Sequence, residues 1–165
     1  MQVAPNLKVV VISGDTASGK SALARALYSA LDGGWHLLQA DDFIGPAFKE
    51  LANRGSWDPD GRRICRRVLY ESARSGMERV KVALLVEGFF QEAREIDDLL
   101  ESTGTSVDKG SARILHLVVS ESEARRRRPY EEPRTAEVHP KATTCHTDAN
   151  DAVRMFDWAR EALSR

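Results

Sequence analysis

A glycine-rich octapeptide near the N-terminus could bind phosphate groups. Residues 14–21 consist of Gly14, Asp15, Thr16, Ala17, Ser18, Gly19, Lys20 and Ser21, and they fit the pattern GxxxxGK[ST] without a gap. Glycines allow the backbone to turn successive N–H groups inward around phosphate oxygens. In this pattern Lys20 reaches the β- and γ-phosphates, and the hydroxyl of Ser21 ligates Mg²⁺. The octapeptide therefore predicts a nucleotide site, with ATP and Mg²⁺ as cofactors.

The residues on either side of the octapeptide predict the strand–loop–helix context that such a site needs. Residues 7–13 read LKVVVIS, a run that is apolar on both faces and therefore typical of a central parallel strand. Residues 21–31 carry leucine and tyrosine at helical spacing. The N-terminal dipole of this helix would point at the bound anion.

Acidic side chains follow two further predicted strands. Asp41 and Asp42 come after the strand expected at residues 35–39, and Glu87 comes after the strand expected at residues 81–86. Ligands of parallel α/β sheets lie at the carboxyl ends of the strands. Phosphoryl transfer to a hydroxyl needs a group that accepts or orients the hydroxyl proton, and carboxylates on the Mg²⁺ side. The alternatives are a helix cap or Asx turn for the aspartates and a solvated strand end for the glutamate.

The rest of the chain continues the alternation of strands and helices. We expect helices at 61–75, 91–100, 121–128 and 150–163, and strands at 112–119 and 142–145. This order predicts an α/β fold with a parallel five-stranded sheet covered by helices on both faces. A chain of 165 residues suggests one domain, 1–165. Residues 43–60 look irregular, and residues 129–141, with three prolines, look like a mobile loop within a short lid around 121–141.

The composition argues against several classes of protein. Lys and Arg number 24 and Asp and Glu number 25, so no global field attracts nucleic acid or an anionic membrane. The start of the chain does not resemble a signal peptide, and no apolar run is long enough to span a membrane. Cys65 and Cys145 are expected to be reduced thiols. We therefore expect a cytoplasmic protein, either a monomer or a homodimer.

Five motifs together resemble a known enzyme family. GDTASGKS, QADDFIGP, GSWDPD, ALLVEGFF and EARRRRP, in this order and spacing, resemble the nicotinamide riboside kinase and uridine kinase branch of the P-loop kinases. The resemblance covers residues 9–133. It implies an ATP-dependent kinase that transfers the γ-phosphate to the ribose 5′-hydroxyl of a nucleoside.

The resemblance also implies roles for individual residues. Asp41 corresponds to the catalytic base, and it is also expected to bind Mg²⁺ together with Ser21 and Glu87. Asp42 and Phe43 belong to the same motif and are expected at the substrate. Trp57 and Asp58 occupy the place of the aromatic–aspartate pair that contacts the nucleoside, with the carboxylate on the ribose diol.

The arginine run at 125–128 has two interpretations. A run of four arginines could bind nucleic acid, but Glu121, Glu123, Glu131 and Glu132 surround it and make the local field mixed. The resemblance instead implies a lid over the phosphates. Arg125 and Arg128 share one face of a helix, and we therefore assign them to transition-state stabilisation.

The histidines give little indication of function. His116, which is flanked by leucines in a predicted strand, is interpreted as structural, and we assign no role to His139 or His146.

The end of the chain leaves other acceptors and one other class of protein open. After Pro129 the sequence lacks the longer lid segment usual in the family. Small antibiotic-modifying P-loop phosphotransferases share this compact layout, so another small alcohol is an alternative acceptor. A regulatory P-loop ATPase is the alternative from a different class. A switch GTPase is disfavoured because the sequence contains no N-K-x-D-type guanine motif.

Overall fold

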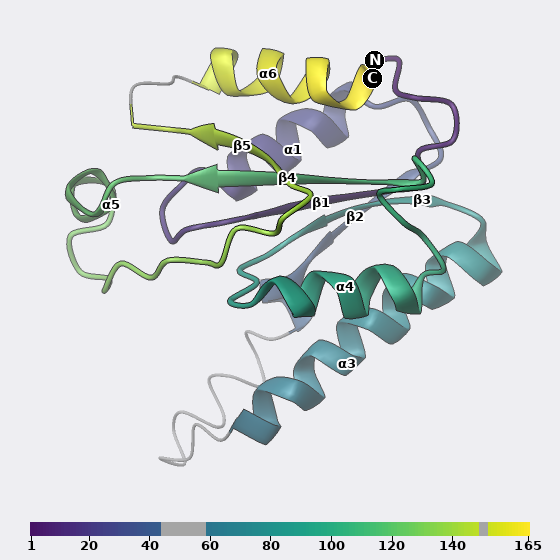
Figure 1. Cartoon of the computed structure of the whole chain (residues 1–165), viewed down its shortest axis with the longest axis horizontal. Helices are drawn as coiled ribbons and strands as arrows, with labels where there is room; N and C mark the ends of the chain where they lie inside the picture. Colours follow the sequence, from purple (N-terminus) through teal and green to yellow (C-terminus); the bar gives the residue numbers. More distant parts are fainter. Residues whose placement is uncertain (44–58, 149–151) are drawn as a thin grey trace.

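A parallel sheet of five strands lies at the centre of the described part of the chain (Figure 1). The computed structural model describes residues 1–43, 59–148 and 152–165, without the side chains of residues 59–65. The strands are β1 (Val9–Gly14), β2 (Trp35–Gln39), β3 (Ala83–Glu87), β4 (Ala112–Val118) and β5 (Thr143–His146), and their order in the sheet is β2-β3-β1-β4-β5. The predicted fold class is therefore confirmed.

Helices cover both faces of this sheet (Figure 1). One face packs against α1 (Lys20–Ala30) and α6 (Ala152–Ser164), and the other packs against α3 (Pro59–Ser75) and α4 (Ala93–Ser102). A short helix, α5 (Glu121–Arg127), follows β4, and a π-helical turn, η1 (Gly76–Val80), extends α3. Sequence periodicity did not predict this turn. No described helix has the length and apolarity that a membrane span requires.

The strand β1 divides the hydrophobic core into two parts. Its side chains alternate, with Val10 and Ile12 packing towards α1 and α6, and Val9 and Val11 packing towards α3 and α4. All four side chains are fully buried. Removing each from water contributes about 1.5–3 kcal/mol, which explains why this segment is apolar on both faces.

The register of the sheet brings the ends of the central strands to one level. Ile12 of β1 pairs with Glu87 of β3, and Glu87 in turn pairs with Gln39 of β2. Because all strands are parallel, the loops that follow β1, β2 and β3 emerge at the same edge of the sheet. The residues at 40–43 are helical rather than a turn, so Asp41 lies at the start of a helical segment.

The segment at 129–141 differs from the prediction in its second half. We expected few anchoring contacts, but several hydrogen bonds hold residues 134–141. They are Thr16 N–H to Arg134 O (2.9 Å), Ala136 N–H to Asp15 Oδ1 (3.0 Å), Glu137 N–H to Gln91 O (3.0 Å) and His139 Nε2 to Asp97 Oδ1 (3.1 Å). The groups of this segment that make these contacts are backbone groups and a buried histidine. The sequence-based expectation considered only large apolar side chains and therefore missed them. The short lid expected around 121–141 stays a prediction.

Candidate active site

The octapeptide forms the loop between β1 and α1. Gly14 ends β1 so close to β4 that a Cβ atom there would lie 2.1 Å from the carbonyl oxygen of Leu117, and only glycine fits. Gly19, with φ of 96°, precedes the first residue of α1. Gly19, at the N-cap position, offers no side chain that hydrogen-bonds to the helix, and the first turn contains no acidic residue. Within the described part of the chain, no N-cap side chain therefore competes with a ligand for the first N–H groups of α1, an arrangement that suits a phosphate.

Lys20 is buried beneath the loop. Its ammonium group donates a hydrogen bond to the backbone oxygen of Asp15 at 2.6 Å. Burial lowers the pKa of Lys20, while the negative charges of Glu87, Asp15 and Asp41 raise it in part. A phosphate group in the cavity would supply the further negative charge that favours the ammonium form.

Glu87 lies between the end of β2 and the start of α1. Its carboxylate, only 3% exposed, accepts a hydrogen bond from Ser21 Oγ at 3.3 Å and one from Gln39 Nε2 at 3.1 Å. A hydroxyl and a carboxylate side by side are the oxygen ligands that Mg²⁺ prefers. The donor set therefore fits the metal that the sequence implies. Gln39 was not identified from the sequence as a site residue, although it is the first residue of the QADDFIGP motif.

Gly88 allows the end of β3 to lie close to Ala40, the residue before Asp41. A Cβ atom at Gly88 would lie 2.6 Å from the Cβ atom of Ala40, so a side chain there would push the two strand ends apart. Asp41 consequently lines the same cavity as Lys20 and Glu87. The glycine of the ALLVEGFF motif thus has a packing role in the site.

The remaining predicted substrate residues divide into two groups. Asp42 is exposed and does not line the cavity, and Phe43 packs against the core on the α3 and α4 face. Trp57 and Asp58 lie outside the described residues. The ribose-binding assignment of this pair stays a prediction.

A cavity of about 380 Å³ lies where these groups meet, at the carboxyl edge of the sheet. Its walls come from the phosphate-binding loop, the start of α1, the ends of β2 and β3, and the segment after β4. Of the predicted octapeptide, Thr16, Ala17, Gly19, Lys20 and Ser21 line it. Its lining is more polar than apolar, which suits phosphate groups.

The two arginines assigned to the phosphates are placed differently from one another. Arg125 is exposed, pairs with Glu121 at 2.8 Å and does not line the cavity. Arg128 does line it and pairs with Glu131 at 2.9 Å. The assignment of Arg125 to the phosphates therefore has no support from its placement.

Arg127 is the arginine that contacts the phosphate-binding loop. It is 25% exposed and donates hydrogen bonds to the backbone oxygens of Ala17, at 3.1 Å, and of Thr147, at 2.7 Å. Its remaining donor pairs with Glu123 at 2.7 Å. Arg127 thus ties the loop to the end of β5. The helical spacing of the arginine run did not identify it.

Arg134 and Phe89 also line the cavity and were not predicted. The guanidinium group of Arg134 lies over the Phe89 ring, 5.0 Å from its centroid. Phe89 belongs to the ALLVEGFF motif, which could have drawn attention to it. No local pattern distinguishes Arg134 within its segment.

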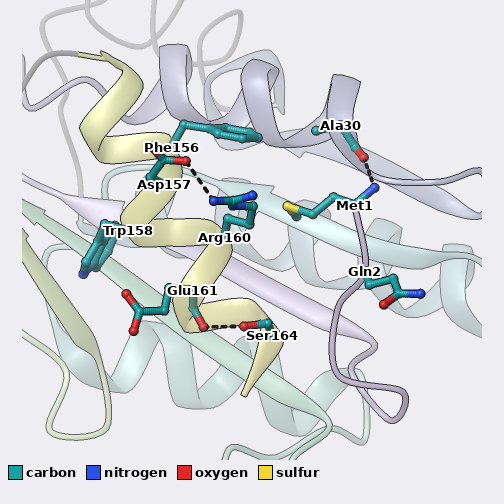
Figure 2. Close-up of a pocket in the computed structure, with 9 residues that line it drawn as sticks. All are labelled: Met1, Gln2, Ala30, Phe156, Asp157, Trp158, Arg160, Glu161 and Ser164. Carbon is teal, nitrogen blue, oxygen red and sulfur yellow. Dashed lines mark hydrogen bonds and ion pairs between the residues drawn. The ribbon is translucent and has the colours of Figure 1, made fainter.

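A larger cavity lies elsewhere in the fold (Figure 2). It has a volume of about 1020 Å³ and is bounded by α6, the N-terminal residues and the last residue of α1, Ala30. The amino group of Met1 donates a hydrogen bond to Ala30 O at 2.6 Å. Arg160 and Asp157, both on α6, form an ion pair at 3.2 Å in the wall of this cavity. This cavity is at the opposite end of α1 from Lys20 and contains none of the predicted site residues. The smaller cavity is therefore the candidate site.

Comparisons with known proteins identify the family and the fold of the chain. A family model described as "AAA domain" matches residues 9–154. No curated protein sequence matches the chain. Among solved structures, a sugar kinase from Janibacter sp. HTCC2649 is 18% identical, with a TM-score of 0.70 over 96% of this chain and 95% of that one. A gluconokinase from Sinorhizobium meliloti 1021 is 20% identical, with a TM-score of 0.66 over 96% and 90%.

An APS kinase from Mycobacterium tuberculosis, solved with AMPPNP and APS, is 15% identical, with a TM-score of 0.67 over 98% and 100%. At such identities the structures show the fold alone, which is that of small-molecule P-loop kinases. The family match covers most of the chain, including the octapeptide and both acidic motifs. The chain therefore belongs to the P-loop family described as "AAA domain" and has a kinase-like fold.

Proposed function

We propose that this protein is an ATP-dependent kinase that transfers the γ-phosphate to a hydroxyl group of a small molecule. One observation carries the proposal: a single cavity is lined by the phosphate-binding loop, by Lys20 and Ser21, and by the strand-end carboxylates Asp41 and Glu87. In a kinase, Asp41 would orient an acceptor hydroxyl, whereas a regulatory ATPase would use such a side chain to orient water. The two functions therefore differ in whether turnover depends on an acceptor.

In the proposed transfer, each group has a part. The N–H groups at the start of α1 and the ammonium of Lys20 bind the phosphates and compensate their charge. The carboxylate of Asp41 accepts the proton of the acceptor hydroxyl while the oxygen of that hydroxyl attacks the γ-phosphorus. The bond from this phosphorus to the bridging oxygen breaks, and ADP leaves with the electron pair.

Mg²⁺ would be held by Ser21 and by Glu87, directly or through water. Bound there, it would neutralise negative charge on the phosphate oxygens. The described residues include no cluster of three or more His, Cys, Asp or Glu side chains suited to a metal. Mg²⁺ in kinases typically uses one or two carboxylates together with phosphate and water oxygens, so two protein ligands suffice.

For the acceptor, we propose a nucleoside that is phosphorylated at its ribose 5′-hydroxyl. The support is the sequence resemblance, above all Trp57 and Asp58 after the acidic motif. The structural neighbours are named for a sugar, gluconate and APS, and these compounds therefore belong in any test.

A transfer screen tests the proposal. Purified protein is incubated with γ-labelled ATP, Mg²⁺ and a panel that contains uridine, nicotinamide riboside, sugars, gluconate, APS and hydroxylated antibiotics. We expect rapid labelling of one acceptor class, and a loss of about 10²–10⁴-fold in kcat for Asp41→Asn, as is typical when a general base is removed. Asp42→Asn is the matched control, because its carboxylate lies outside the cavity.

Three results would contradict the proposal or a part of it. Slow ATP hydrolysis that no acceptor accelerates would favour a regulatory ATPase. Labelling of a sugar or an antibiotic without any nucleoside would retain the kinase but exclude the nucleoside. If Asp42→Asn proved damaging and Asp41→Asn mild, the catalytic base would be the second aspartate.

A further inference from the structure

The arginines around the cavity differ in whether a carboxylate engages them. Arg127 pairs with Glu123 at 2.7 Å, and Arg128 pairs with Glu131 at 2.9 Å. Arg25 and Arg134 also line the cavity, and no ion pair or hydrogen bond joins either guanidinium group to a residue that the structure describes. Of these two, Arg134 is the one that lies over a ring of the same cavity, that of Phe89. The five N–H donors of Arg134 are therefore available to a ligand.

The position of Arg134 is nevertheless fixed from two sides. Its backbone oxygen accepts a hydrogen bond from Thr16 N–H at 2.9 Å, and two residues later Ala136 N–H donates to the buried carboxylate of Asp15 at 3.0 Å. The Cζ atom of its guanidinium group lies over the Phe89 ring, 5.0 Å from the centroid. A guanidinium held by such a contact keeps its N–H donors for a ligand, and it can bind a phosphate bidentately.

The partners of Arg134 indicate which phosphate it would meet. Thr16 is the third residue of the octapeptide, before the N–H groups of α1 that bind the inner phosphates. Phe89 follows Glu87 by two residues, at the end of β3 where Mg²⁺ and the acceptor hydroxyl are proposed to lie. Arg134 thus lies on the outer side of the loop, where a nucleotide places its terminal phosphate.

We infer that Arg134 is a nucleotide-binding residue that contacts the γ-phosphate. This inference rests on the proposed function only in taking the cavity as an ATP site. Arg134, held over the Phe89 ring, would distinguish a triphosphate from a diphosphate. It would also neutralise negative charge on the phosphate group being transferred.

Nucleotide binding by calorimetry tests the inference without any acceptor. Wild type and Arg134→Gln are titrated with AMPPNP and with ADP, both with Mg²⁺. We expect Arg134→Gln to bind AMPPNP on the order of tenfold to a hundredfold more weakly, as for a lost charge-assisted contact, and to bind ADP within about twofold of wild type. Arg126→Gln is the matched control, because Arg126 is exposed, pairs with Glu123 and does not line the cavity.

A second variant keeps the test decisive if Arg134→Gln does not fold. Phe89→Leu retains an apolar wall but removes the ring that orients the guanidinium, and we expect the same selective loss for AMPPNP, several-fold in size. Unchanged AMPPNP affinity in the folded variants would overturn the inference. Equal losses for AMPPNP and ADP would also overturn it, since they would show a general effect on the loop.

An acceptor subsite is the competing role for this arginine. If the folded variants bound both nucleotides normally and only the KM for the acceptor rose, Arg134 would bind the acceptor, and the γ-phosphate assignment would be wrong. Suppose that wild type bound AMPPNP and Arg134→Gln showed the expected loss, but wild type labelled no acceptor. The proposed kinase activity would then be wrong, and this inference would stand. A wild type that bound neither nucleotide would overturn both.

Discussion

Asp15 offers the sharpest test of how the phosphate-binding loop is held. Its carboxylate is buried and accepts two backbone hydrogen bonds, from Ala136 N–H to Oδ1 and from Val119 N–H to Oδ2, both at 3.0 Å. Asp15→Asn replaces one of these oxygens by an NH₂ group. The amide can accept from only one of the two N–H groups, and the other then faces a donor.

The magnitude follows from these two contacts. A hydrogen bond to a charged group contributes about 1.5–3 kcal/mol, and a buried N–H left without a partner costs about 1–3 kcal/mol. Relief from burying a charge offsets part of this loss. We therefore expect Asp15→Asn to lower the free energy of unfolding by about 2–3 kcal/mol, which corresponds to a Tm lowered by about 5–10 °C in a domain of this size.

Thermal and urea unfolding measure this change. Asp98→Asn is the control, because its carboxylate is half exposed on α4 and lies 4.0 Å from Arg94. We expect it to cost less than about 0.5 kcal/mol. If Asp15→Asn were no more damaging than Asp98→Asn, the two hydrogen bonds would not hold the loop, and the argument for a fixed Arg134 would weaken with them.

Three further predictions concern the charge, packing and protonation of the site. Lys20→Ala should lower transfer by on the order of 3–4 kcal/mol of transition-state stabilisation while the circular dichroism spectrum stays unchanged, and normal turnover would exclude the loop from the mechanism. Gly88→Ala should overpack against Ala40 and lower stability by about 1–3 kcal/mol, as measured by urea unfolding, together with a lower kcat. Burial lowers the pKa of His116, so the unfolded chain binds this proton more readily, and stability should fall as the pH drops below about 6.5. His116→Leu should flatten this dependence in unfolding curves from pH 7 to 5, whereas mutation of the exposed His36 should not.

The sequence predicted the central part of the site because that part depends on short-range rules. A buried strand followed by GxxxxGK[ST] and a helix has few other structural solutions, so the placement of Lys20 and Ser21 follows from the motif. Asp41 and Glu87 could be placed because the carboxyl ends of parallel strands meet at one edge. The structure brings all four residues to one cavity.

The arginines could not be chosen in this way. Helical spacing grouped Arg125 with Arg128, but the face that α5 turns inward is set by the contacts of Arg127 with Ala17 and Thr147. These partners are far away in the sequence, and no local pattern encodes them. The same reason hides Arg134, whose position depends on Thr16 and Asp15 more than a hundred residues earlier.

The distribution of charge explains how a slightly acidic chain can nevertheless bind a polyanion. The whole chain has a net charge of -1, whereas the described cavity lining contains five cationic and three acidic side chains. Two of the acids, Asp41 and Glu87, are needed for the hydroxyl proton and the metal in the proposed mechanism, so the excess of positive charge is left to the phosphates. A local excess of this kind raises the concentration of a nucleotide at the cavity without attracting nucleic acid to the rest of the surface. Because Lys20 is buried and its pKa is lowered, a bound phosphate would stabilise its charged form, so that nucleotide binding and protonation of Lys20 would favour one another.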